Sequence, residues 1–223
     1  MNVVAVIPVK RFGRALGRLA GVLSREERAD LQAAMLTDLL EACTACPRLA
    51  GVTVVSSDPQ ATALAAGAGA RTLPDHDPPR GMNAAVAIGR SDAAARGADA
   101  VLVLTADLPL AAPNDLAAVV DALGTAGGVL VPSRDGTGTN ALLLRPPEAM
   151  GTHLGPDSRA QHHRHAGRVG LVLRDHEVPG IAVDIDTPDD LALLLAAPRS
   201  THAQRVCRRM GLDERLAAAG APS

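Results

Sequence analysis

The chain has 223 residues, of which 47% are hydrophobic, and its formal net charge is −2. This size and composition fit one α/β domain with a sizeable core, and the small net charge gives no support for a polyanion or an anionic membrane surface as partner. The chain contains one Phe and no Tyr or Trp, which argues against a stacking platform for single-stranded nucleic acid.

The cysteines and the N-terminal residues indicate in which cellular compartment we expect the protein. Three cysteines do not make a disulfide framework, and Cys43 and Cys46 lack the second pair that a zinc site needs, so we interpret them as packing residues. The N-terminus carries no secretory signal, and no apolar run approaches the ~18 residues of a membrane span. We therefore expect a cytoplasmic protein with neither a membrane nor nucleic acid among its partners.

Strands and helices alternate through the first half of the chain. Continuous apolar runs predict buried strands at residues 3–9, 51–57, 70–73 and 101–105. Helices are predicted at residues 24–45, 58–67, 83–96 and 113–123. The first of these helices begins at a capping box of Ser24 and Glu27. Because the strands are apolar without alternation and are separated by helices, we expect a parallel core sheet with helices on both faces.

The second half contains several strands without a helix between them. Strands are predicted at residues 127–132, 141–144, 169–173 and 181–185. We expect these strands to add antiparallel pairs at an edge of the sheet. A second capping box, Ser158 with Gln161, predicts a helix, and Pro188 suits the first position of the last core helix. Residues 1–197 are predicted to form one domain, and residues 198–223 a peripheral helical tail.

Two acidic segments follow apolar runs that we predict to be strands. Asp107 comes directly after the central strand, and Asp184 and Asp186 follow the apolar run 180–183. In an open α/β sheet the ligand crevice lies beyond the carboxyl ends of the strands, so we expect these carboxylates to converge. Mg²⁺ commonly takes one or two carboxylates together with substrate phosphates. The alternative for Asp186 or Asp189 is an ordinary cap of the helix that begins at Pro188.

Cationic and glycine-rich loops supply candidate anion sites. Lys10, the only lysine, lies with Arg14 and Arg18 after the first strand. This cationic group could bind a polyphosphate. The alternative is a basic loop that is simply solvated. Residues 136–140 and 155–158 combine glycines with hydroxyls, which fit either anion binding or a hairpin turn and a helix cap.

The histidines and serines narrow the chemistry. His162 could contact a phosphate or a carboxylate or lie on a solvated face. His162, His163 and His165 do not share one helix face, so they do not suit zinc. No serine has a recognisable His–acid pair that would make it a nucleophile. These residues therefore favour direct phosphoryl-type transfer without a covalent intermediate.

The order of these motifs resembles the phospholactate guanylyltransferase family of coenzyme F(420) biosynthesis. The matching segments are VIPVK at 6–10, RL at 18–19, LSREER at 23–28, MLTD at 35–38, VVS at 54–56, MNAA at 82–85, ADLP at 106–109, GTGTNAL at 136–142, GPDS at 155–158 with His162, and DIDTPDDL at 184–191. They cover nearly the whole chain up to about residue 195, and together they are quite specific.

The resemblance implies a GT-A-like, Rossmann-related nucleotidyltransferase, a three-layer αβα sandwich with a mixed, mainly parallel sheet. It implies GTP as donor, Mg²⁺ as cofactor, and a phosphorylated three-carbon acid as acceptor: 2-phospho-L-lactate, phosphoenolpyruvate or 3-phospho-D-glycerate. By motif, the acid would be held by Thr139, Gly155 and Ser158, with His162 beside them. Mg²⁺ would be bound by Asp107 and Asp184, with Asp186 in support. Guanine would lie near Asn83 and the backbones of Pro8 and Ser56, and the leaving pyrophosphate near Lys10 and Arg18.

One position departs from the family pattern. The family usually reads Ala-Lys-Ser-Arg-Leu after the first strand, whereas this chain has Leu16 in place of the lysine. This departure suggests one alternative, a GTP-binding homologue without catalysis. A separate alternative is another transferase on the same scaffold, such as a molybdenum cofactor guanylyltransferase or a glycosyltransferase. The missing aromatics make a pterin acceptor less attractive. The residues leave the choice of phospho-acid open, and they leave a homodimer open as the oligomeric state.

Overall fold

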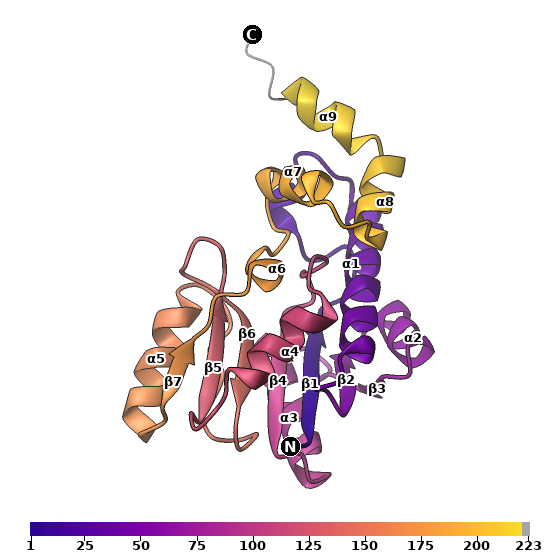
Figure 1. Cartoon of the computed structure of the whole chain (residues 1–223). Coiled ribbons are helices and arrows are strands. Elements are labelled where there is room, and N and C mark those ends of the chain that lie inside the picture. The colour runs from indigo at the N-terminus through magenta and orange to yellow at the C-terminus, as the bar shows by residue number, and fades with distance from the viewer. Residues whose placement is uncertain (220–223) are drawn as a thin grey trace.

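The computed structural model describes residues 1–219 of the chain, as a sheet covered by helices (Figure 1). Its elements are β1 Val3–Val9, η1 Gly17–Leu19, α1 Arg25–Ala45, β2 Gly51–Ser56, α2 Pro59–Gly67, β3 Arg71–Leu73, α3 Met82–Ala95, β4 Ala100–Leu104, α4 Pro113–Asp121, β5 Gly128–Pro132, β6 Thr139–Leu144, α5 Ser158–Val169, β7 Leu173–Asp175, α6 Pro179–Ala182, α7 Pro188–Ala196, α8 His202–Arg209 and α9 Leu212–Ala219. The last four residues of the predicted tail, 220–223, lie outside the described residues.

The sheet has seven strands in the order β3-β2-β1-β4-β6-β5-β7. Strands β1, β2, β3 and β4 pair in parallel, whereas β6 is antiparallel to both of its neighbours, β4 and β5. The predicted mixed, mainly parallel sheet is therefore confirmed. The expected antiparallel additions at an edge are also found: the later strands β6, β5 and β7 all lie beyond β4, at one edge of the parallel core, and β6 makes two antiparallel pairs. The chain crosses from β4 past one open position to β5 and then returns as β6 to fill it, and β7 forms the edge, parallel to β5.

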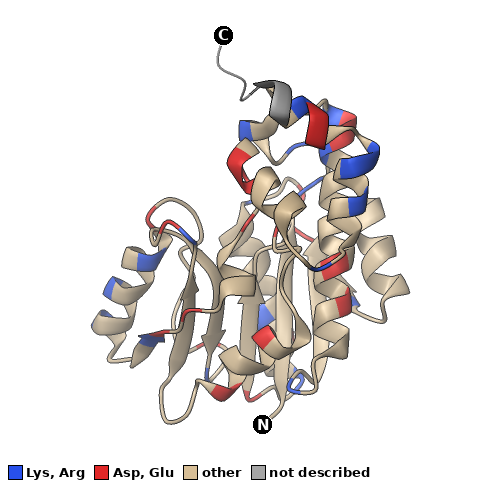
Figure 2. Ribbon diagram, turned by 45° about the horizontal axis from the view of Figure 1, so that its top comes forward, with Lys and Arg blue, Asp and Glu red and all other residues tan. Residues whose placement is uncertain are grey.

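Helices cover both faces of the sheet, which makes the three-layer sandwich. The five inner strands carry no charged residue, and Figure 2 shows charge on helices, loops and the edges. One face packs Ile7 and Leu102 against α1, α2 and α4, and the other packs Val6 and Val103 against α3 and α5. Strands buried on both faces explain the continuous apolar runs of the sequence.

The region that we predict to be a tail is helical and packs on α1 (Figure 1). Ala203 and Cys207 of α8 are buried in a separate hydrophobic cluster with Leu31 of α1 and Leu191 of α7. Asp38 of α1 accepts hydrogen bonds from the first two backbone N–H groups of α8, at 2.7 and 2.9 Å. A carboxylate at a helix N-terminus stabilises that end of the helix, so α1 fixes where α8 begins.

Two predicted strands and one predicted cap are wrong. Residues 169–173 divide between the end of α5 and the start of β7, and residues 181–185 contain the end of the short helix α6 followed by irregular backbone. The carbonyls of Ile181 and Ala182 accept from the side-chain amide of Asn140. A side chain therefore replaces a strand ladder there. The cap of α5 is Asp157, in a left-handed conformation without a side-chain bond, rather than Ser158.

No helix within residues 1–219 is both long and apolar enough to cross a membrane.

Candidate active site

A cleft of about 550 Å³ opens beyond the carboxyl end of β4, between the β5–β6 loop, the start of α5 and the segment before α7. We call it the acidic cleft. The sequence-predicted residues that line it are Arg18, Asp107, Thr139, Gly155, Ser158, Asp184 and Asp186. Six aspartates and two arginines face it, so a phosphorylated ligand there requires additional positive charge.

The two acidic segments are joined through the backbone. The N–H of Ile185 donates to the carbonyl of Asp107 at 3.1 Å, and this bond sets Asp184 and Asp186 beside the end of β4. Asp184 also accepts a hydrogen bond from the amide of Asn140 at 3.1 Å. Asn140 belongs to the glycine-rich segment that we singled out, but its bond to Asp184 was not predicted; its signal in the sequence is an amide at the start of an otherwise apolar strand.

Asp107 is poorly compensated in this structure. Among the described side chains its Oδ1 is buried without a hydrogen-bond partner. Burial first, and then the charges of Asp184 and Asp186, raise the pKa of Asp107 to about 7, although the neighbouring Thr105 hydroxyl offsets part of the rise. Burial, with the charges of Asp186 and Asp190, raises the pKa of Asp184. A divalent cation is a partner that would stabilise such a group of hard oxygen donors.

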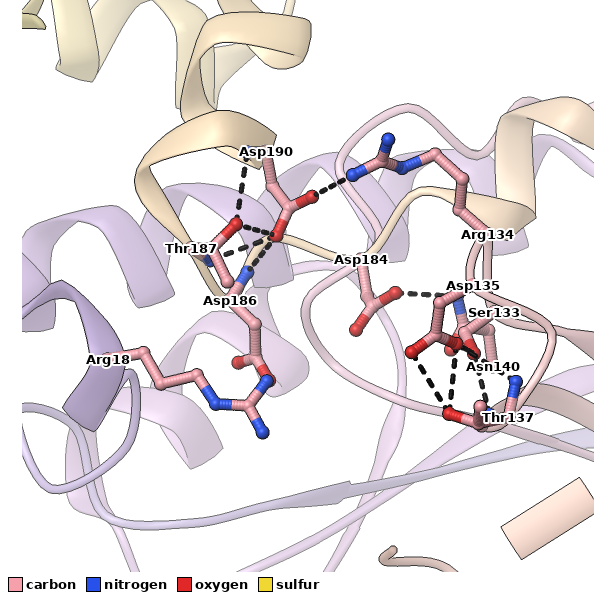
Figure 3. Close-up of polar contacts among 11 residues, drawn as sticks. Arg18, Ser133, Arg134, Asp135, Thr137, Asn140, Asp184, Asp186, Thr187 and Asp190 are labelled. Carbon is pink, nitrogen blue, oxygen red and sulfur yellow. Dashed lines mark hydrogen bonds and ion pairs between the residues drawn. The ribbon is translucent and has the colours of Figure 1, made fainter. Parts of the chain in front are cut away.

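Asp190 anchors the acidic segment (Figure 3). Its carboxylate accepts from the N–H and hydroxyl of Thr187 at 2.9 and 2.7 Å and from Arg134 at 2.9 Å. Burial alone would raise the pKa of Asp190, but these hydrogen bonds hold it below its usual value. Asp190 therefore completes a capping box at α7 with Thr187. The N-cap residue is Thr187, and neither Asp186 nor Asp189 caps this helix. Arg18 approaches Asp186 at 3.8 Å and stays largely exposed.

The β5–β6 loop is shaped by Asp135. Its carboxylate accepts from the hydroxyl of Ser133 at 2.6 Å and from the N–H and hydroxyl of Thr137. These bonds, with that of Ser133 first, lower the pKa of Asp135 to about 2. A Cβ at Gly138 would lie 2.6 Å from the Ser133 oxygen, so the turn requires glycine. Thr137 and Thr139 both line the cleft, but the N–H and hydroxyl of Thr137 are already bonded to Asp135.

The opposite wall comes from the loop between β6 and α5. Gly155 has a φ of +137°, which disfavours a side chain, and Asp157 holds a left-handed φ of 52° at the start of α5. Ser158, almost fully buried, lines the cleft at the first turn of that helix. A helix N-terminus presents N–H groups and a positive dipole, which suit an anion. His162, one turn further, is 0% exposed and lies behind Thr139 rather than in the cleft.

The cationic residues that we grouped together are divided between the acidic cleft and a second cavity of about 520 Å³. Lys10 and Arg14 line it with Pro8, whereas Arg18 lines the acidic cleft, and Met82 lines both. The second cavity therefore adjoins the acidic cleft across Met82.

Two residues predicted near guanine line neither cavity. Asn83 holds the backbone of Leu154 through both its amide atoms, and the Ser56 hydroxyl donates to the carbonyl of Val9 at 2.9 Å. Their side chains thus brace the walls of the two cavities.

A different group of potential ligands lies at the α1–α8 junction. Within residues 1–219, the ligand atoms of Asp38, Glu41 and His202 lie within 4.8 Å of one another. Asp38 is already bonded to the N-terminus of α8, and His202 Nε2 lies 2.9 Å from a Glu41 oxygen. These three side chains therefore already have hydrogen-bond partners without a metal ion. The orphaned oxygen of Asp107 makes the acidic cleft the better candidate for a metal.

Comparison with known proteins gives consistent relatives. A family model described as "Guanylyl transferase CofC like" matches residues 3–221 and thus includes most of the region that we set outside the resemblance. The chain is 41% identical over 191 residues to a phosphoenolpyruvate guanylyltransferase of Sphaerobacter thermophilus, covering 86% of this chain and 91% of that protein. It is 43% identical over 197 residues to a protein of the same name from Conexibacter woesei, covering 87% of each.

Solved structures with low sequence identity share the fold. One is a proposed nucleotide-diphospho-sugar transferase from Desulfovibrio desulfuricans G20, with a TM-score of 0.75, 16% identity, and coverage of 97% of this chain and 99% of that one. Another is a nucleotidyl transferase from Methanothermobacter, with a TM-score of 0.67, 15% identity, and coverage of 93% and 99%. The predicted fold class is therefore confirmed.

Proposed function

Because this chain belongs to the CofC-like guanylyl transferase family, we propose that it joins GMP from GTP to a phosphorylated three-carbon acid and releases pyrophosphate, in the biosynthesis of coenzyme F(420). The names of the relatives favour phosphoenolpyruvate as the acceptor. The reaction is the one that we expect from the sequence. A cytoplasmic location, a homodimer and the division at residue 197 stay predictions.

The observation that carries this proposal is the acidic cleft itself. Asp107, buried with one orphaned oxygen, lies beside Asp184 and Asp186 in a cleft whose other wall offers Thr139 and the N-terminus of α5. The second cavity, with Lys10 and Arg14, adjoins it across Met82. We assign the acceptor to the acidic cleft, which Asp107 lines, and the nucleotide to the second cavity, so that the two substrates meet across Met82.

The residues present fit Mg²⁺. Asp107 and Asp184, with Asp186 nearby, would hold the ion by oxygen ligands. When bound, it would supply positive charge that offsets the phosphate oxygens and the six aspartates of the cleft.

The protein's own residues bind and orient the substrates. Thr139 and the first turn of α5 would hold the acid and its phosphate, and Gly155 would allow the backbone to approach it closely. An acceptor phosphate oxygen attacks the α-phosphorus of GTP in line. A new P–O bond forms, and the bond to the β-phosphate breaks. Lys10, which lines the nucleotide's cavity, would receive the leaving pyrophosphate, whereas Arg18 lies on the acceptor's side, at the acidic cleft. Positioning and electrostatics carry the reaction, since an ionised phosphate needs no general base.

Incubation of the protein with GTP, Mg²⁺ and an equal mixture of the three phospho-acids tests the proposal, with mass detection of the guanylylated product. We expect one dominant product, from phosphoenolpyruvate, together with pyrophosphate. Asp107→Asn should abolish both. GTP binding without product from any of the three acids would instead identify the non-catalytic homologue that Leu16 suggests. Leu16 is buried in the hydrophobic cluster around α7 and α8 with a left-handed φ of 57° and offers no charge.

A further inference from the structure

His162 is a buried polar residue that makes no contact with the cleft. It lies in the second turn of α5, is 0% exposed, and is absent from the lining of both cavities. Besides a backbone hydrogen bond with Ser158 of its own helix, its ring makes two hydrogen-bond contacts with the walls of the cleft. Nε2 accepts from the backbone N–H of His153 at 2.8 Å, and Nδ1 lies 3.1 Å from the hydroxyl oxygen of Thr139. One imidazole thus joins the two walls that we assign to the acceptor.

These contacts fix the tautomer. The N–H of His153 can only donate, so Nε2 of His162 must carry a lone pair. Burial lowers the pKa of His162 to about 4, and the ring is therefore neutral near neutral pH. A neutral imidazole has one N–H, which must then be on Nδ1. It donates to the oxygen of Thr139, and the proton of the Thr139 hydroxyl is left free for a ligand in the acidic cleft.

The same ring holds the loop that carries Gly155. The backbone of His153 is bonded to His162, and His153 Nε2 lies 2.6 Å from Nδ1 of His165. The next residue, Leu154, is held at both its N–H and its carbonyl by Asn83, at 2.8 and 3.0 Å. The segment before Gly155 is therefore fixed between α3 and α5, and His162 is the residue that connects it to Thr139.

We propose that His162 is a positioning residue. Its Nδ1–H orients the Thr139 hydroxyl so that this hydroxyl donates to the acceptor acid, and its Nε2, by binding the N–H of His153, fixes the position of the loop that carries Gly155. His162 acts through Thr139 and does not touch the substrate, which departs from the direct phosphate or carboxylate contact considered for it from the sequence. This inference rests on the proposed function in one respect, namely that Thr139 binds the acceptor acid.

Two amide variants separate the two contacts. In His162→Asn the amide nitrogen can take the place of Nδ1 and keep the donor to Thr139. In His162→Gln the amide reaches the place of Nε2, and the donor to Thr139 is lost. His163→Gln is the matched control, because the adjacent His163 contacts Asp175 on the outside of α5 at 2.7 Å.

Steady-state kinetics with phosphoenolpyruvate should show a selective effect. We expect His162→Gln to raise the KM for the acid by about tenfold, as for one lost hydrogen bond, with the KM for GTP unchanged. His162→Asn should recover part of this loss, and His163→Gln should match the wild type. An acid KM within about twofold of wild type in His162→Gln, or an equal rise in the KM for GTP, would overturn the inference.

A spectroscopic test on the wild type needs neither turnover nor a variant. ¹⁵N NMR of histidine-labelled protein should show His162 as the Nδ1–H tautomer, still neutral at about pH 5.5, well below the ordinary histidine pKa of about 6.5. An Nε2–H tautomer, or ordinary titration, would refute the inference even if the enzyme is active. Conversely, a wild type that yields no product from any acid removes the proposed function, and the NMR result still decides whether His162 orients Thr139.

Discussion

Asp107→Asn should make the metal-free protein more stable while removing its activity. Asparagine keeps the shape of the side chain and removes its charge. In the folded protein that charge is buried with an orphaned oxygen and faces Asp184 and Asp186. In the unfolded chain the same carboxylate is solvated. The wild type therefore carries a cost of folding that the variant lacks, and this cost depends on pH.

The raised pKa gives the magnitude and the direction. The pKa of Asp107 rises from an ordinary 3.8 to about 7 on folding. Below about pH 4 the carboxyl is protonated in both states and contributes no difference in stability. As the pH rises from about 4 to about 7, the unfolded chain ionises first and the wild type loses stability, by up to about 4 kcal/mol at 1.36 kcal/mol per pKa unit. Relative to Asp107→Asn, the deficit should be largest above about pH 7 and vanish near pH 4.

Chemical denaturation with a chelator present, at about pH 4.5 and about pH 8, measures this difference. Added Mg²⁺ should stabilise the wild type at the higher pH by binding its folded state, and should have little effect on the variant. Asp189→Asn is the control, because Asp189 is in the same acidic segment but is exposed and does not line the cleft.

Two results would contradict this reasoning. A variant that is less stable than the wild type at about pH 8 without metal would show that the Asp107 carboxylate is well compensated. Near-normal pyrophosphate release by Asp107→Asn would remove the residue from the reaction. Either result would leave the family assignment standing, since that assignment rests on the relatives.

Other variants test the walls of the cleft and the packing around it. Thr139→Val should raise the KM for the acid by about tenfold or more in steady-state kinetics, whereas Thr139→Ser should keep most of the affinity. Gly89→Ala should destabilise the fold by about 1–3 kcal/mol in chemical denaturation, since its Cβ would lie 2.5 Å from a Val6 methyl; Gly67→Ala, with open space, is the control. Asp38→Ala should cost about 1–2 kcal/mol by removing the bonds to α8, while activity per folded molecule stays unchanged; a loss of activity at equal folded fraction would contradict it.

Periodicity predicts most of the sheet because its strands are buried on both faces. The runs at β1 and β4 are apolar throughout, and β2 adds only the buried Thr53 and Ser56, a pattern typical of strands covered on both faces. It fails at residues 181–185, where Ile181 and Ile185 are buried in different clusters. A short apolar run has no periodicity that separates a strand from a turn of helix, and the amide of Asn140 that bonds this segment is distant in sequence.

A site residue is predictable when its own position or motif identifies it, and it is not when its role depends on contacts between distant segments. Asp107 is recognisable from its position directly after a buried strand, and Thr139 and Ser158 from their motifs. The division of Lys10 and Arg18 between two cavities depends on the path of the loop between them. The tautomer of His162 depends on a backbone N–H nine residues earlier. Neither fact has a signature in residue type or spacing.

The hydrogen bond between Ile185 and Asp107 joins two segments that the ribosome makes at different times. The residues that line the second cavity lie between residues 8 and 85, Asp107 follows them, and Asp184 comes much later. On the proposed chemistry, a chain that stops before Asp184 has only half of the carboxylate pair. GTP would then be consumed only by chains synthesised through the acidic segment before α7.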